Sequence, residues 1–169
     1  MPDSADKILT SHDLVVRPFR MTDQAACATL YTNGLLGGKL AENDTGVDID
    51  DIDAAYCIPG SGFWVAQIAG GAVIGTVGVM QVEEGVGEIR RLRVRTDIRR
   101  RGIGTKLLET AIEFCREQSY LKITLDTYID REPAIKLFEK FQFRHTRTRD
   151  VLGKNLSYFY LDLYGREKD

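Results

Sequence analysis

One segment rich in glycine and arginine has the residue types and spacing most able to do chemistry. Residues 87–109 read GEIRRLRVRTDIRRRGIGTKLLE, a strand-like run followed by a loop and the start of an amphipathic helix. The first turn of a helix offers backbone N–H groups without partners and a partial positive charge, and together these bind phosphate. Gly102 and Gly104 remove side chains that would keep a phosphate away from those amides. Three consecutive side chains add donors for phosphate oxygens, namely Arg99, Arg100 and Arg101.

The same region allows other interpretations. Seven arginines lie between Arg90 and Arg101, and such a run is also typical of a solvated basic face or a nucleic-acid-binding surface. The run has no interleaved aromatic side chains for base stacking, and the chain as a whole carries a net charge of -2. A P-loop at residues 35–40 (LLGGKL) fails at Leu40, where Ser or Thr would hold magnesium. We therefore favour the phosphate site and keep a nucleic-acid-binding domain as the least favoured alternative.

The elements around this segment must hold it in place, and their patterns predict a mixed α/β domain. Two apolar runs joined by Gly70 and Gly71 read as a hairpin, and residues 88–94 follow a second glycine turn, which predicts three consecutive antiparallel strands. Residues 103–117 carry apolar side chains at helical spacing. We also expect strands at 14–19, 121–125, 143–148 and 156–163, and helices near 22–30, 50–56 and 133–141. A single domain spans residues 1–169 in this interpretation, with residues 1–12 as a flexible tail.

The arrangement R-x-x-G-x-G at Arg99, Gly102 and Gly104 resembles the pyrophosphate-binding motif of the GNAT superfamily of N-acetyltransferases. The stretches VRPFRMTD, REPAIKLFEKFQF and YFYLDL extend the resemblance over most of residues 14–163, while residues 32–60 match no pattern. The resemblance implies an α/β fold of the α+β type with three layers. It has a mostly antiparallel, twisted sheet of six to seven strands, about four flanking helices, and a βαβ crossover at the CoA site.

The resemblance also implies that acetyl-CoA is the acyl donor. The strand ending in LRV would separate from its neighbour at a bulge, and the pantetheine arm would lie against that strand. The implied cofactor-binding residues are Leu92, Arg93, Val94, Arg99, Arg100, Arg101, Gly102, Ile103, Gly104, Thr105 and Phe138. No metal is expected.

A direct attack of a primary amine on the thioester requires a base and no protein nucleophile. Glu88 matches the strand glutamate that is the base in the histone-acetylating branch of the superfamily. Phe138 stands where many relatives have a tyrosine that protonates the leaving thiolate, so Tyr128 is the candidate substitute acid. Because Phe138 has no proton to give, an acyl-CoA-binding module without turnover is the main alternative. The cysteines, Cys27, Cys57 and Cys115, are expected to be buried thiols.

The acceptor is expected to be a small-molecule or peptide amine. Residues 42–53 hold six acids and no base, which suggests a cationic acceptor such as a polyamine, an aminoglycoside-like amine, a lysine or an amino terminus. A solvated acidic loop explains the same residues. The first ten residues contain no apolar run, and no later stretch approaches the roughly 20 residues needed to cross a bilayer, so we expect a cytoplasmic protein without membrane or nucleic-acid partners. Dimers are common among proteins of this kind, and a homodimer is compatible with the resemblance.

Overall fold

The apolar strand-like runs form one seven-stranded sheet with the order β1-β2-β3-β4-β5-β7-β6. The computed structural model describes residues 13–36, 40–98 and 102–164, so the predicted tail at 1–12 lies outside the described residues. The strands are β1 (Leu14–Pro18), β2 (Gly62–Ile68), β3 (Val73–Glu83), β4 (Val86–Val94), β5 (Lys122–Tyr128), β6 (Arg144–Val151) and β7 (Lys154–Asp162). Neighbouring strands are antiparallel except β4 and β5, which are parallel. The predicted mostly antiparallel sheet with one crossover is confirmed.

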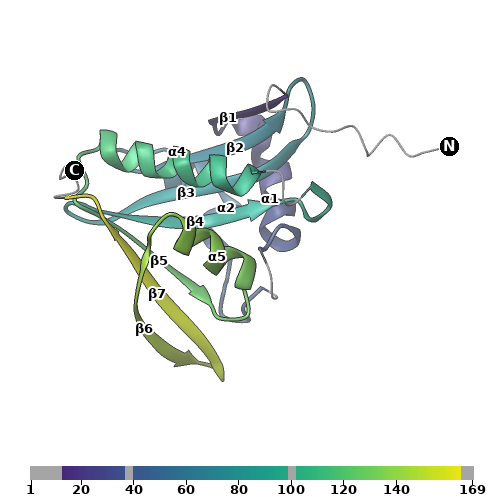
Figure 1. Cartoon of the computed structure of the whole chain (residues 1–169). Coiled ribbons are helices and arrows are strands. Elements are labelled where there is room, and N and C mark those ends of the chain that lie inside the picture. The colour runs from purple at the N-terminus through teal and green to yellow at the C-terminus, as the bar shows by residue number, and fades with distance from the viewer. Residues whose placement is uncertain (1–12, 37–39, 99–101, 165–169) are drawn as a thin grey trace.

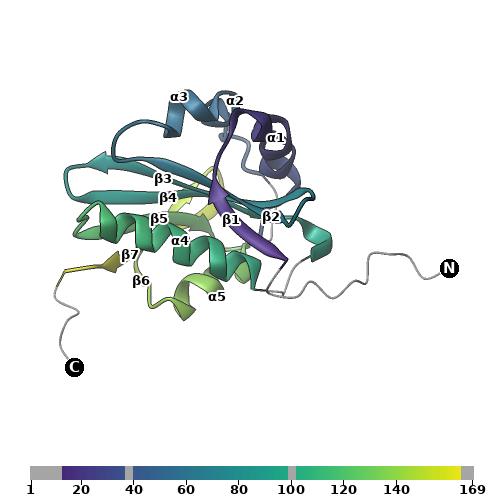
Figure 2. The ribbon, with the colours of Figure 1, turned by 90° about the horizontal axis from the view of Figure 1, so that it is seen from above.

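Helices cover both faces of this sheet and give the three expected layers (Figure 2). The helices α4 (Ile103–Glu117) and α5 (Glu132–Lys140) lie on one face, and α1 (Gln24–Asn33), α2 (Val47–Asp50) and α3 (Ile52–Tyr56) lie on the other. The predicted apolar face of α4 is buried at all six of its positions, Ile103, Leu107, Leu108, Ala111, Ile112 and Cys115. A smaller core under α2 and α3 contains Cys27, Ile49, Ile52, Tyr56, Phe63 and Val65.

Two local expectations differ from the structure. The helix expected near residues 50–56 is divided into α2 and α3, because Asp51 is non-helical (φ -146°, ψ 84°) and its carboxylate instead accepts a hydrogen bond from the Ala54 N–H. Cys27 and Cys115 are buried as expected, whereas Cys57 is exposed. None of the helices in the described part of the chain is long and apolar enough to span a membrane.

The parallel pair β4–β5 joins the two halves of the sheet over a short distance only. Its register comprises Val86–Lys122, Gly87–Ile123 and Glu88–Thr124. Beyond Glu88 the two strands form no further ladder pairs. On its other edge, β5 pairs with β7 along its whole length. The hairpin of β6 and β7 extends this second half away from α4 (Figure 1). The sheet therefore opens at its centre.

Candidate active site

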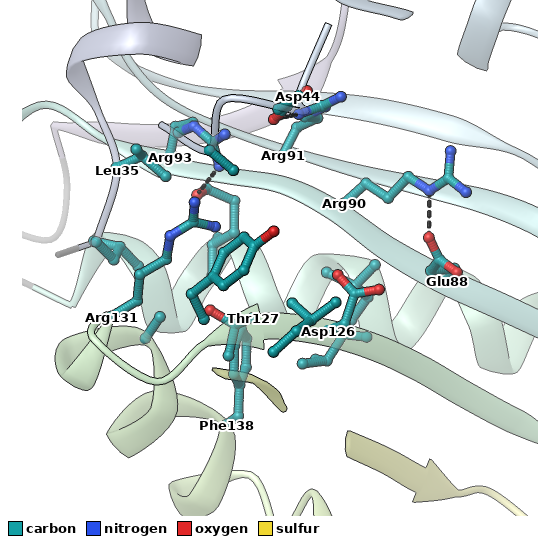
Figure 3. Close-up of a pocket in the computed structure, with 18 of the residues that line it drawn as sticks. Leu35, Asp44, Glu88, Arg90, Arg91, Arg93, Asp126, Thr127, Arg131 and Phe138 are labelled. Carbon is teal, nitrogen blue, oxygen red and sulfur yellow. Dashed lines mark hydrogen bonds and ion pairs between the residues drawn. The ribbon is translucent and has the colours of Figure 1, made fainter. Parts of the chain in front are cut away.

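A cavity of about 350 Å³ occupies the opening between β4 and β5. Its walls come from residues 88–93 of β4, residues 125–128 of β5, the connection that follows α1, and α5 (Figure 3). The volume lies within the range of roughly 300 to 1,000 Å³ that is usual for small-molecule sites. The cavity brings together three of the residues selected from the sequence for chemistry, Glu88, Tyr128 and Phe138.

A β-bulge in β4 forms one wall of this cavity. Thr76 of β3 pairs with Arg93 and Gly78 pairs with Arg90, so Arg91 and Leu92 together face a single residue of β3. Arg91 has a positive φ of 55°, and the Thr76 hydroxyl donates a hydrogen bond of 2.8 Å to its carbonyl oxygen. Bulges of this kind re-aim side chains next to functional sites. The expected bulge and strand separation are present.

Leu92, Arg93 and Val94 differ in their access to the cavity. Leu92 and Arg93 line it, whereas Val94 is buried and its backbone N–H donates to the Gly34 carbonyl at 2.9 Å. The Val94 N–H is therefore already used within the protein. A role of Leu92, Arg93 and Val94 in binding the pantetheine arm stays a prediction.

Arg91 anchors the acidic segment to the bulge. Its guanidinium donates to Asp48 through two bonds of 2.8 and 2.6 Å and to Asp44 at 2.6 Å. Burial is the largest single influence and would raise the pKa of both carboxyls, but the hydrogen bonds and charge of Arg91, together with hydrogen bonds from other groups, hold each pKa below its usual value. The Tyr56 hydroxyl also donates to Asp48. Two of the six acids that suggested a cationic acceptor are thus neutralised within the protein.

Two carboxylates lie in the cavity on opposite strands. Glu88 is ion-paired with Arg90, two residues further along β4. The Asp126 side chain on β5 is exposed at the cavity. Its pKa is nevertheless raised, first because the surrounding protein partly desolvates the carboxyl and then because the negative charge of Glu88 lies nearby. Asp126 lies one residue beyond the expected end of the strand at residue 125 and was therefore not among the predicted site residues. The alternation continued from Thr124 would have placed it on the same face.

The two aromatic candidates occupy the wall opposite the bulge. The Tyr128 hydroxyl donates to the Asn43 Oδ1 at 3.3 Å, and the Arg131 guanidinium lies 5.1 Å from the centre of the Tyr128 ring. Phe138 is buried and packs against the rings of Phe143 and Phe159. Phe138 thus forms an apolar wall of the cavity.

The start of α4 has the geometry that the glycine pattern suggests. Gly102 precedes the helix and adopts φ 73°, a conformation that strains any residue with a Cβ. Among the described residues, none lies within 4 Å of the place that such a Cβ would take. A Cβ on Gly104 would lie 3.1 Å from Cδ2 of Leu137, so Gly104 allows α4 and α5 to approach closely. Ile103 is buried and Thr105 is half-buried. Arg99, Arg100 and Arg101 lie outside the described residues, and phosphate binding at this junction stays a prediction.

Comparisons with known proteins agree with this geometry. Residues 38–143 match the profile of the acetyltransferase (GNAT) family. N-acetyltransferase 8 of Rattus norvegicus is 34% identical over 105 residues, which are 59% of this chain and 47% of that protein. N-acetylaspartate synthetase of Xenopus tropicalis is 38% identical over 100 residues, 58% of this chain and 36% of that protein. The chain thus spans about half the length, or less, of these curated relatives.

A solved structure shows the same fold. A putative acetyltransferase from Salmonella typhimurium, determined with its cofactor acetyl-CoA, superposes with a TM-score of 0.77 at 20% sequence identity. The alignment covers 92% of this chain and 97% of that chain. At this identity the comparison concerns the fold alone.

Proposed function

The chain belongs to the acetyltransferase (GNAT) family, and on this basis we propose that it is an N-acetyltransferase that moves the acetyl group of acetyl-CoA to a primary amine. One observation carries the proposal, namely the cavity that opens where β4 leaves β5, next to the bulge at Arg91. Such an opening would let a thioester lie between the two strands, within reach of an amine in the same cavity.

The donor would be held at two places. The diphosphate would bind the free amides at the start of α4, where Gly102 leaves open space. The pantetheine arm would pass between β4 and β5, with its thioester near Leu92. A backbone N–H aimed at the developing oxyanion contributes roughly 10²- to 10³-fold per donor.

The reaction would be a direct attack. The amine nitrogen forms a bond to the acetyl carbon, the carbon–sulfur bond breaks, and CoA leaves as the thiolate. Deprotonating a lysine-like amine at pH 7 costs about 4.6 kcal/mol, so a base within reach of the nitrogen is useful. Glu88 would take the proton, directly or through water, from its position in the cavity.

The support for a cationic acceptor is limited. Asp44 and Asp48 are occupied by Arg91, and the remaining acids of residues 42–53, Glu42, Asp50, Asp51 and Asp53, are exposed on the surface. An exposed acidic segment attracts cations only weakly at physiological salt. We therefore propose primary amines in general as acceptors.

A binding module without turnover is the second candidate, because Phe138 cannot protonate a leaving thiolate. The two functions differ in the release of CoA from acetyl-CoA in the presence of polyamines, amino acids and peptides. We expect release that depends on the amine, and a large loss of kcat in Glu88→Gln. Stabilisation by acetyl-CoA without any amine-dependent release would favour the binding module. At 100 times its Kd a ligand stabilises a fold by about 2.7 kcal/mol, which a thermal shift detects readily.

A further inference from the structure

The cavity between β4 and β5 carries opposite charges at its two ends. Arg93 and Arg131 lie together at one end, and Glu88 and Asp126 lie toward the other (Figure 3). A polar site of this kind favours a ligand with a negative group at one end and an amine at the other. The arginines that line the cavity differ in whether a carboxylate already neutralises them, and this difference decides which of them can bind such a ligand.

The two other arginines of β4 that line the cavity, Arg90 and Arg91, are already matched. Arg91 is paired with two aspartates and Arg90 with Glu88. Arg91 thereby holds the acidic segment of residues 42–53 against β4, whereas the Arg90 pair lies within β4 itself, and neither charge leaves much for a ligand.

Arg93 is different. Its side chain is almost fully buried, at 6% exposure, and its hydrogen bonds go to the backbone carbonyl oxygens of Tyr31 at 3.0 Å and Leu92 at 3.1 Å. No carboxylate within the described residues lies at salt-bridge distance from it. Burial, followed by repulsion from Arg91 and Arg131, lowers the pKa of Arg93 to about 10. The guanidinium of Arg93 thus lacks a matching negative charge.

Arg131 adds a second guanidinium from the other half of the sheet. It lies in the connection between β5 and α5, is half-buried, and stacks near the Tyr128 ring. Figure 3 shows the Arg93 and Arg131 side chains reaching toward each other across the cavity. Two guanidinium groups in a partly desolvated site repel each other. An anion between them is attracted to both, and this attraction offsets the repulsion. Planar guanidinium donors match the geometry of carboxylates as well as phosphates, and of the two we assign the carboxylate here.

We propose that the acceptor is an amine that also carries a carboxylate, as an α-amino acid does. Arg93 and Arg131 bind the carboxylate, and the amino group faces Glu88. This inference rests on the proposed function, because it names the acceptor of that same cavity.

The test compares acceptors that differ only in the carboxylate. Amine-dependent release of CoA from acetyl-CoA is measured with a set of L-amino acids and with their carboxamides. A hydrogen-bonded charge pair changes affinity by about 10- to 100-fold, so we expect the acid to exceed its amide in kcat/KM by about that factor. In Arg131→Gln we expect the preference to fall to near one, with the KM for acetyl-CoA unchanged. A rise in that KM matching the lost preference would assign the arginines to the donor and overturn the inference.

Two further measurements keep the result independent of turnover. Arg144→Gln removes an exposed arginine on β6, outside the cavity, and should keep the full preference. With CoA present, N-acetyl-L-amino acids should raise the Tm of wild type and not of Arg131→Gln, whereas their amides should raise neither. Equal behaviour of acids and amides in both assays would reject the carboxylate site, even if turnover supports the proposed function. Acid-selective stabilisation without turnover would support the site and count against the proposed function.

Discussion

Arg91 and Asp48 are joined by two parallel hydrogen bonds, in which Nε donates to Oδ2 at 2.8 Å and Nη2 donates to Oδ1 at 2.6 Å. Arg91 is also the bulge residue with φ 55°, and Asp48 belongs to α2. The pair therefore ties the segment that follows α1 to the strand that borders the cavity. A change at Asp48 is transmitted to the cavity wall because the two elements share this contact.

Asp48→Asn should lower the free energy of unfolding by about 2 kcal/mol. Both side chains of the pair are mostly buried, at 16% and 15% exposure, so the loss leaves Arg91 partly uncompensated. Urea denaturation at pH 7 measures the effect. Asp50→Asn alters an exposed acid of the same helix and should stay within about 0.5 kcal/mol of wild type. Equal effects of the two substitutions would contradict the structural role of the pair.

Asp23 should make the stability depend on pH in the acid range. Hydrogen bonds from Arg17 hold the pKa of this buried carboxyl below its usual value, despite the opposing effect of burial. A depressed pKa stabilises the folded state above the unfolded-state pKa of about 3.9, and this contribution is lost as pH falls through the folded-state pKa. Asp23→Asn should therefore be less stable at pH 7 and show a shallower decline between about pH 5 and 3.

Urea titrations at several pH values test this expectation. Asp97→Asn is the matched control, because the Asp97 carboxyl also pairs with an arginine but is 62% exposed. Exposed pairs contribute little, so its pH dependence should follow wild type. An unchanged slope in Asp23→Asn would show that other carboxyls, such as those beside Arg91, carry the acid dependence.

The elements could be predicted where the local pattern alone decides them. The apolar face of α4 follows from a period of 3.6 residues, and the strands from alternation bounded by glycine turns. The break at Asp51 escaped this reasoning, because a polar side chain that caps the next helix looks the same in sequence as one within a helix.

The site could be predicted only in part for a different reason. Glu88, Tyr128 and Phe138 were found through the resemblance, and they do line one cavity. Asp126 was not selected because the strand was expected to end one residue before it. Arg131 was not selected because its position in the cavity depends on the separation of β4 from β5. No local pattern records that long-range geometry.

Gly102→Ala should cost about 1 to 2 kcal/mol in stability and weaken acetyl-CoA binding. The cost arises from the backbone, since φ is 73° and a Cβ there would meet no atom of the described residues within 4 Å. Gly70→Ala is the matched control, because Gly70 has φ 67° and equally open surroundings but lies in the β2–β3 turn. Both variants should lose similar stability, and only Gly102→Ala should raise the Kd for acetyl-CoA. A Kd unchanged by Gly102→Ala would remove the α4 start from the proposed donor site.

Tyr128→Phe tests whether the phenol in the cavity assists the leaving thiolate. A thiol of pKa about 8.5 leaves with little help, so the loss of kcat should be near 10-fold, below the 10²- to 10⁴-fold of a strong general acid. The KM for acetyl-CoA should stay the same, because the substitution keeps the aromatic ring in the cavity wall and removes only the hydroxyl that bonds to Asn43. Adding Phe138→Tyr should restore part of the activity, since Phe138 lines the same cavity at the position where the family resemblance implies a tyrosine. Tyr158→Phe, on β7 outside the cavity, should change neither parameter. A full-rate Tyr128→Phe enzyme would leave solvent water as the proton donor.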